Sequence, residues 1–326
     1  MPPFSREHLQ ACAVEAARGK RRRPQVAWFL FRLETETRRL AEALTADTWR
    51  PSPFDVILIR DPKPRAIARA PFEDRVVQSV VARALEPVFL PATLHGDMAC
   101  RTGGGTGHAV LLAREYLRRY RFAVHLDVRA YFPSVQPDLA LRLVERRVRH
   151  DGLLRVLGRI LDAGRGIVDR PGVRAWVGLP PGDPPPGIGL PVGAHTSQFL
   201  ATHVYLLALD HHIKRVLRVP GYVRFVDDLL LFGDRRADLR AWREAIGDWL
   251  GLERGLRLKH PDAPVVSSQG HLDALGFRMR RDGVTPLPRA ERRFRHWLRR
   301  AVWDDDLSVD TLRGTVASST FHLMER

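Results

Sequence analysis

Cysteine, lysine and long apolar runs are all scarce in this chain of 326 residues. Its two cysteines, Cys12 and Cys100, are too few for a disulfide framework or a cysteine zinc site, and they favour a reducing, cytoplasmic location. No stretch approaches the roughly 18 consecutive apolar residues of a membrane span, and the N-terminus lacks the apolar core of a signal peptide. We therefore expect no membrane association. The apolar fraction of 44% argues against a largely disordered chain.

Acidic residues are also in deficit. The chain has 53 Lys and Arg against 37 Asp and Glu, which gives a formal net charge of +16. Only four of the basic residues are Lys, and GC-rich codons can produce such an Arg bias, but they do not explain the surplus of base over acid. That surplus favours a polyanionic partner, of which nucleic acid is the commonest. The basic run at residues 20–23 is either a solvated loop or a phosphate contact.

The apolar pattern predicts a mixture of helices and short strands. Helical spacing covers residues 5–50, 72–90, 137–150, 195–218, 237–250 and 288–302. Strands are expected at 54–60 and 122–128, a hairpin at 222–232, and a strand pair at 271–280. Residues 164–191 are rich in Gly and Pro, which predicts an irregular insertion.

Two adjacent carboxylates, Asp227 and Asp228, interrupt the apolar β-run of residues 222–232. A purely structural protein has little reason to place them there, because like charges repel and their burial costs free energy. An exposed Asp-Asp turn is the alternative, since Asp is a good turn former. A third acid, Asp127, ends the expected strand at 122–128.

Acids from one strand and from a neighbouring hairpin can converge on divalent metal ions. Mg²⁺ prefers oxygen ligands, and carboxylates also supply the compensating charge. Two such ions about 3.5–4 Å apart activate an attacking hydroxyl and stabilise the leaving oxygen of an in-line phosphoryl displacement. The three acids therefore predict a site for two Mg²⁺ ions and phosphoryl transfer.

The order of these motifs resembles that of reverse transcriptases, over residues from about 17 to the C-terminus. Asp127 is followed by an aromatic pair, by Gly-x-x-x-Ser at 193–197 and by Phe-x-Asp-Asp at 225–228. The resemblance implies RNA-directed DNA polymerase activity. It implies an α+β right-hand polymerase fold, with fingers, a palm that holds a small antiparallel sheet, and a short helical thumb. The expected domains are residues 1–120 (N-terminal helices and fingers), 121–284 (palm, with an insertion at about 137–190) and 285–326 (thumb).

The resemblance also implies roles for individual residues. Asp127, Asp227 and Asp228 match the catalytic acids that hold two Mg²⁺ ions. Phe132 matches the ring that excludes a ribose 2′-hydroxyl, and a core phenylalanine is the alternative. The other residues expected to contact dNTP, template or primer are Lys63, Arg65, Arg75, Val192, Gly193 and Gln198, with Leu275, Gly276 and Phe277 as the primer-grip turn.

Two positions resemble one subfamily. Most reverse transcriptases carry Gln-Gly-x-x-x-Ser-Pro, whereas Val192 and Gln198 here replace the Gln and the Pro. This double change is typical of the reverse transcriptases of diversity-generating retroelements. It implies frequent errors opposite adenine when a template RNA is copied into cDNA, and a small basic accessory protein as partner. The alternatives are a retron or antiphage-defence reverse transcriptase, and a non-catalytic RNA-binding scaffold with a polymerase fold.

Lysine is absent from two places where the family usually has it. Gly104 stands at the lysine position of the Gly-rich loop 101–107. The segment after Lys259 lacks the downstream lysines from which a general acid for pyrophosphate is expected, and Lys259 is a poor substitute.

Overall fold

The computed structural model describes residues 3–60, 63–101, 103–301, 315–316 and 320. The chain divides into two compact units. The first unit comprises residues 1–92 and 132–205, and the second comprises residues 93–131 and 206–326. This division does not test the three polymerase domains expected from the sequence. Of the expected thumb, residues 302–314, 317–319 and 321–326 lie outside the described residues.

The first unit is mainly helical. Its helices are α1 (Arg6–Ala16), α2 (Pro24–Phe31), α3 (Leu33–Thr45), α4 (Phe72–Phe89), η1 (Leu90–Ala92), α7 (Pro137–Glu145), α8 (Asp151–Ala163), α9 (Pro171–Trp176), α10 (His195–Phe199) and the π-helical η2 (Leu200–Tyr205). The short helix α6 (Tyr131–Ser134) begins at the last residue of a second-unit stretch. The predicted helices before residue 50 and at 72–90 are thus confirmed.

The first unit departs from the sequence prediction at β2 and α9. Strand β1 (Asp55–Ile59) was expected, but its antiparallel partner β2 (Arg65–Arg69) was not. The Arg-Ala-Ile-Ala-Arg sequence of β2 alternates, yet its buried members, Ala66 and Ala68, are too small to give a strong strand signal. The prediction of an irregular insertion at 164–191 is wrong at α9, which is a helix. Pro171 takes the first helical position, where its missing N–H costs nothing.

The second unit is built on an antiparallel sheet. Among its described residues, four strands pair in the order β4-β5-β3-β6, and three more pair in the order β7-β8-β9. The strands are β3 (Phe122–Asp127), β4 (Gly221–Phe225), β5 (Asp228–Gly233), β6 (Val266–Ser267), β7 (Leu272–Ala274), β8 (Phe277–Met279) and β9 (Val284–Pro286). The helices are α5 (Thr106–Arg119), α11 (Leu207–His211), the π-helical η3 (His212–Val216), α12 (Arg236–Arg254) and α13 (Pro288–Ala301). The predicted hairpin and strand pair are therefore confirmed, and β9 is additional.

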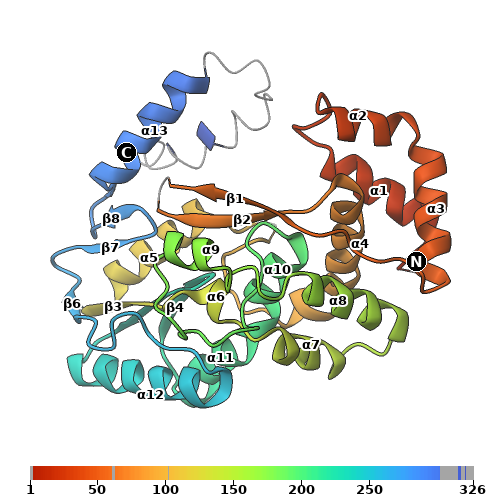
Figure 1. The fold of residues 1–326 in the computed structure, drawn as a ribbon. Helices are drawn as coiled ribbons and strands as arrows, with labels where there is room; N and C mark the ends of the chain where they lie inside the picture. Colours follow the sequence, from red (N-terminus) through yellow and green to blue (C-terminus); the bar gives the residue numbers. More distant parts are fainter. Residues whose placement is uncertain (1–2, 61–62, 102, 302–314, 317–319, 321–326) are drawn as a thin grey trace. The chain divides into compact units, whose positions relative to one another are not determined.

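The four-stranded sheet is buried on both faces. Residues 229–232 of β5 are consecutive apolar side chains, each 1% exposed or less. Leu230 and Phe232 belong to one apolar cluster with α5, and the alternation of a strand turns Leu229 and Leu231 to the other face. Helix α12 contacts β3 and β5 and lies below the strands in Figure 1. Full burial of each such side chain stabilises the fold by roughly 1.5–3 kcal/mol.

The chain therefore has an α+β fold with small antiparallel sheets, as the sequence predicted. In the described ranges, no helix is both long and apolar enough to cross a bilayer.

Gly96 tests the packing of the loop beside β4. A Cβ atom at this position would lie 2.3 Å from the carbonyl oxygen of Tyr222. We expect Gly96→Ala to lower the free energy of unfolding in urea by roughly 1–3 kcal/mol, because the backbone must shift. Gly247→Ala on α12 is the control: its Cβ would meet Leu258 at an ordinary 3.5 Å. That change is expected to stabilise the helix by about 0.5–1 kcal/mol. Equal stabilities for the Gly96 variant and the wild type would contradict the packing described here.

Candidate active site

A two-residue turn joins β4 to β5. Phe225 pairs with Asp228, and Val226 and Asp227 form the connection. Val226 has a φ of +58°, a conformation that is rare for a β-branched residue and costs about 1–2 kcal/mol. The apolar strands on both sides bring the chain into this tight reversal, and Asp227 follows the strained residue directly.

The acid of β3 lies opposite this turn. Asp127 and Asp228 are register partners in the β3–β5 ladder, and directly opposed residues have Cα atoms roughly 4.5–5.5 Å apart. The amide of Val128 donates a hydrogen bond of 3.2 Å to the carbonyl oxygen of Asp227. The sheet therefore brings the three sequence-predicted acids to the same end of two adjacent strands.

A lysine and a histidine side chain partner these acids. Lys259 Nζ lies 3.0 Å from Asp127 Oδ2, and the Lys259 amide donates to the Asp127 carbonyl at 2.8 Å. His125 Nε2 lies 2.6 Å from Asp228 Oδ1. The pairing of His125 was missed, although His125 stands two residues before Asp127 and so on the same face of β3. The ion pair of Lys259 could not be read from its sequence position.

A divalent metal ion needs several ligand side chains that converge on one point. In the part of the chain that the structure describes, no group of three or more His, Cys, Asp or Glu side chains is arranged to hold a metal ion. Asp127 and Asp228, each about one-quarter exposed, are instead paired with Lys259 and His125. The chemistry of the donors nevertheless fits Mg²⁺, since carboxylate oxygens are the hard ligands it prefers.

Several residues expected to contact the nucleotide lie in the first unit. Backbone hydrogen bonds hold the segment that carries Val192 and Gly193. The carbonyl of Val192 accepts a hydrogen bond of 2.7 Å from Ala68 of β2. Gly193 has a φ of +107°, and a Cβ atom there would lie 2.9 Å from a methyl group of Ile67. The amide of His195 donates to Gln78 Oε1 of α4 at 3.2 Å. Residues 192–195 are thus held against both β2 and α4.

The remaining predicted residues of this group lie around the same segment. The carbonyl of Phe132 accepts a hydrogen bond of 2.8 Å from Leu190, two residues before Val192, and Phe132 is half-buried. Arg65 is exposed at the first residue of β2, and Lys63 is exposed shortly before it. Gln198 is exposed on α10. The first unit therefore joins the segments that carry Arg65, Phe132 and Val192.

Positive charge gathers around Arg75 in the first turn of α4. Burial lowers the pKa of Arg75, and the neighbouring charges of Arg23 and Arg69 lower it further. The pKa of Lys20 is likewise lowered by burial, then by Arg75 and Arg23. We call these four residues the Arg75 cluster. Burial and repulsion disfavour the charge of Arg75, although Arg69 is itself paired with Asp55, and a bound anion would offset that repulsion.

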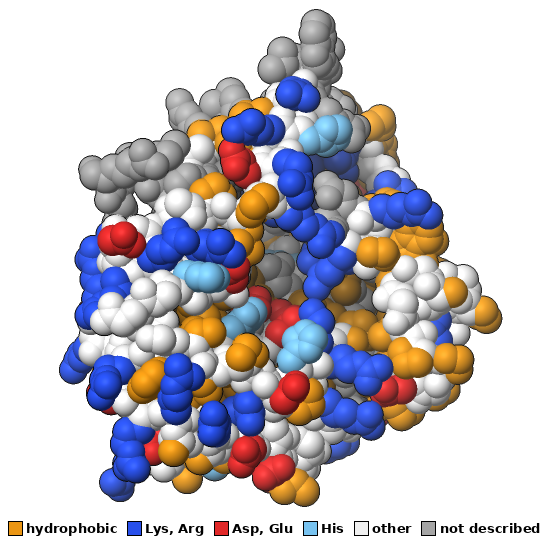
Figure 2. All heavy atoms as spheres, turned by 90° about the vertical axis from the view of Figure 1, so that its left-hand side faces the viewer, with side chains coloured by type: hydrophobic (Ala, Val, Ile, Leu, Met, Phe, Trp, Pro, Cys, Tyr) orange, Lys and Arg blue, Asp and Glu red, His pale blue; other side chains and the backbone are white. Residues whose placement is uncertain are grey.

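Exposed aromatic rings lie just after the basic run 20–23. On α2, Trp28 is 54% exposed and Phe31 is 89% exposed, and Arg32 Cζ lies 5.0 Å from the Trp28 ring. Exposed rings beside cations suit the stacking of unpaired bases. The sequence pattern did not predict that these two rings are exposed, because helical spacing alone does not say which ring stays exposed. Lys and Arg side chains are also spread over the face shown in Figure 2.

The expected primer-grip residues form the turn between β7 and β8. Leu275 and Gly276 have φ values of +55° and +86°. Phe277 is buried in the apolar cluster of the second unit, and the Gly276 carbonyl accepts a hydrogen bond of 2.9 Å from Leu287. The structure thus holds this turn in one place but does not test its role.

Comparison with known proteins finds likeness only at the level of structure. No family model and no curated protein matches the chain. Apo telomerase from Candida tropicalis is similar with a TM-score of 0.51 and 10% identity, over 85% of this chain and 58% of that one. Telomerase from Candida albicans in complex with a TWJ fragment of telomeric RNA gives 0.47 and 11%, over 74% and 46% of the two chains. The Candida tropicalis apo enzyme truncated from its C-terminal domain gives 0.45 and 10%, over 72% and 56%.

The chain thus spans about half the length of these telomerase chains. At this identity the likeness concerns the fold, which resembles that of telomerase, a reverse transcriptase. The prediction of a polymerase-like α+β fold is confirmed to that extent.

The Arg75 cluster gives a test of anion binding. Because burial and like charges disfavour the Arg75 cation, we expect Arg75→Gln to leave the melting temperature unchanged or to raise it. Tripolyphosphate should raise the melting temperature of the wild type, since a ligand that binds only the folded state stabilises it. We expect a clearly smaller rise for Arg75→Gln. The control is Arg38→Gln at an exposed position of α3. An undiminished tripolyphosphate response of the Arg75 variant would exclude Arg75 from the anion site.

Proposed function

We propose that this protein is an RNA-directed DNA polymerase that makes cDNA from a template RNA and dNTPs. The observation that carries the proposal is the register of β3 and β5, which sets Asp127 opposite Asp228 with Asp227 in the adjoining turn. The polymerase-like fold supports it. Fold alone would not, because one fold can serve many activities, whereas acids at strand ends bear directly on the chemistry.

The proposed cofactor is a pair of Mg²⁺ ions held by Asp127, Asp227 and Asp228. When bound, such ions supply charge stabilisation and lower the pKa of an attacking hydroxyl. The residues of this chain hold the three carboxylates at neighbouring strand ends. Lys259 forms an ion pair with Asp127, and His125 contacts Asp228. Binding of the ions would therefore require Lys259 to move away from Asp127 and His125 to move away from Asp228.

The first unit carries the residues proposed to bind the nucleotide. Arg65, Lys63 and Arg75 would contact the triphosphate, because guanidinium groups suit phosphate oxygens. Phe132 would exclude a ribose 2′-hydroxyl. Val192, Gly193 and Gln198 would line the pocket for the nascent base pair, with residues 275–277 of the second unit gripping the primer. The net charge of +16 and the exposed rings of α2 suit an RNA template.

Replacement of the acids tests the catalytic assignment. We expect Asp127→Asn and Asp227→Asn to reduce RNA-templated primer extension by several orders of magnitude, because metal charge stabilisation supplies several kcal/mol of the barrier. Asp228→Asn should have a milder effect. Asp248→Asn, at an exposed position of α12, should extend the primer like the wild type. Urea unfolding of each variant shows whether it is folded. Near wild-type extension by folded Asp227→Asn would refute the site.

A finer proposal concerns the subfamily. We infer that the enzyme belongs to a diversity-generating retroelement, has a small basic accessory protein as partner and makes frequent errors opposite adenine. The support is Val192, whose apolar side chain stands where most relatives have Gln. A valine fills volume but offers no hydrogen bond to hold the incoming nucleotide in register. Sites that do not read polar groups discriminate poorly, often by only about 1–3 kcal/mol.

Fidelity measurements test this subfamily assignment. On a defined RNA, sequencing of the cDNA should show more errors opposite adenine than opposite the other bases. Val192→Gln should lower that excess, because a hydrogen-bonding group returns to the pocket. The accessory protein is added if the genome supplies one. Equal error rates at all four bases would favour the retron or defence alternative, and no cDNA at all would favour the non-catalytic scaffold.

A further inference from the structure

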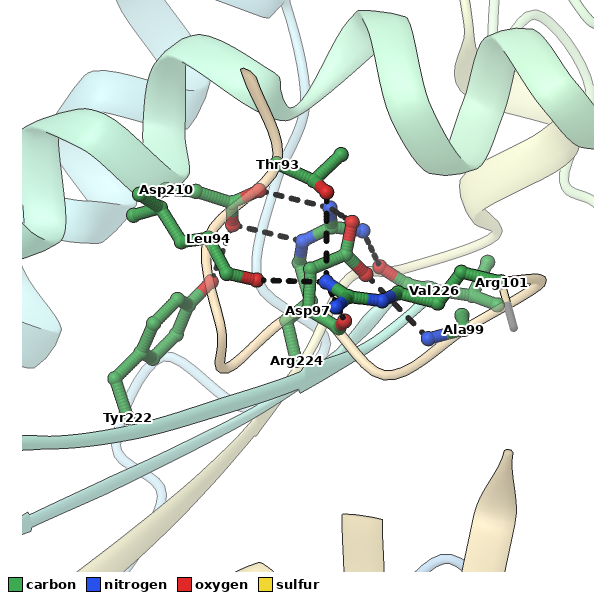
Figure 3. A network of polar contacts seen from close by, with 9 residues as sticks. All are labelled: Thr93, Leu94, Asp97, Ala99, Arg101, Asp210, Tyr222, Arg224 and Val226. Atoms are coloured by element: carbon green, nitrogen blue, oxygen red, sulfur yellow. Dashed lines mark hydrogen bonds and ion pairs between the residues drawn. The ribbon is translucent and has the colours of Figure 1, made fainter. Parts of the chain in front are cut away.

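A fully buried arginine lies two residues before the Val226–Asp227 turn (Figure 3). Arg224 of β4 has no exposed side-chain surface, and neither do its acidic partners Asp97 and Asp210. Its Nε and Nη2 atoms donate to the two carboxylate oxygens of Asp210 on α11, both at 2.8 Å. Nη2 also lies 2.8 Å from Asp97 Oδ2. The hydroxyl of Tyr222 donates to Asp210 Oδ1 at 2.7 Å.

The same guanidinium reaches the strained turn. Arg224 Nη1 donates a hydrogen bond of 3.2 Å to the carbonyl oxygen of Val226, the residue with the φ of +58°. That carbonyl is joined directly to the nitrogen of Asp227. The three nitrogens of Arg224 therefore connect two buried carboxylates to the peptide that leads into the acid pair.

The strand that carries Arg224 is fixed as well. Its amide donates to the Gly96 carbonyl at 2.8 Å, and its carbonyl accepts from Met98 at 3.0 Å. Arg101 donates to the carbonyls of Leu94 and Asp97, both at 3.2 Å, which brings a second cation beside the network. The backbones of Arg224 and of its partner Asp97 are therefore both held in place by hydrogen bonds.

Burial of a charged network of this kind costs folding free energy, because the charges lose their contact with water. Burial raises the pKa of Asp210, and the attraction of Arg224 offsets this only in part. Replacing buried ion pairs by apolar groups is often neutral or stabilising, so such a pair is weak evidence for a purely stabilising role. The β4–β5 hairpin already has the buried residues 229–232 to hold its strands. Those apolar contacts do not hold the backbone of Val226. Arg224 holds it through the hydrogen bond to the Val226 carbonyl.

We propose that Arg224 is a positioning residue for the acid pair: by holding the Val226 carbonyl it keeps the strained turn in the conformation that aligns Asp227 and Asp228 with Asp127. Strained residues persist where the surrounding structure over-determines them, and they cluster at functional sites. The inference rests on the proposed function for its effect on catalysis, but its effect on ion binding can be measured separately.

Arg224→Lys is the first variant to measure. Lysine keeps the charge but has no planar fork, so it cannot contact Asp210 twice and Val226 at once. Luminescence of bound Tb³⁺, a probe of carboxylate sites, should show at least about tenfold weaker binding, because the carboxylates no longer align. In primer extension, kcat should fall on the order of 100-fold, the effect of a displacement of about 1 Å at a reacting centre. The KM for dNTP and the affinity for RNA should stay near wild type, which a general loss of structure would not allow.

A matched control exists in the first unit. Arg159 Nη1 lies 2.8 Å from Asp47 Oδ1, and Asp47 also has a positive φ, +59°. Arg159→Lys makes the same chemical change beside a similar backbone strain, in the unit that does not carry the three acids. It should leave the Tb³⁺ affinity and the kcat unchanged.

Two further variants keep the test decisive if Arg224→Lys does not fold. Asp210→Asn preserves the shape of the side chain but removes the negative charge that pairs with the Arg224 guanidinium. The Tb³⁺ affinity should therefore fall while the urea midpoint stays measurable. Val226→Gly removes the strain and frees the turn, so it should raise stability but weaken Tb³⁺ binding. Unchanged Tb³⁺ affinity in a folded Arg224→Lys protein, or in both of these variants, would overturn the inference.

Failure of the proposed function gives a different result. If the wild type binds Tb³⁺, loses it in Asp227→Asn and yet extends no primer, the polymerase proposal fails while the role of Arg224 is still decided by the Tb³⁺ titrations. If the wild type neither binds Tb³⁺ nor extends a primer, both proposals fail.

Discussion

The guanidinium of Arg224 is out of reach of water, and three segments of the second unit depend on it. The loop before α5 supplies Asp97, α11 supplies Asp210, and the β4–β5 hairpin supplies Arg224 itself. Removing such charges from water costs several kcal/mol per ion, and only a complete set of partners repays it. The network therefore links the acid-bearing turn to residues more than a hundred positions earlier in the chain.

Much of the second unit follows from local pattern. The apolar run around Asp227 and Asp228 predicts a hairpin, and the hairpin forms with both acids at its tip. Asp127 ends a strand, as its apolar neighbours indicate, and pairs with Asp228. These predictions succeed because strand alternation and turn chemistry are properties of neighbouring residues. They needed no knowledge of which strands lie side by side.

What the sequence could not supply are the partners distant in the chain. Lys259 reaches Asp127 from 132 residues away, and Arg224 pairs with Asp97, which also lies more than a hundred positions away in the chain. Arg224 looked like one more arginine in an Arg-rich chain, although a charge inside an otherwise apolar strand could have suggested a buried partner. In the first unit, β2 was missed because alanine gives little strand signal, and α9 because Gly and Pro dominate its surroundings.

The loop of residues 96–98 has one more consequence, through its hydrogen bonds to Arg224. These bonds occupy the outer edge of β4, on the side away from β5. A strand edge with open N–H and C=O groups invites another chain to add a strand, which is a common route to aggregation. At the opposite edge, β6 is only two residues long. The loop of residues 96–98 therefore covers the outer edge of β4 at Arg224, the position where an added strand would compete with the network that holds the acid-bearing turn.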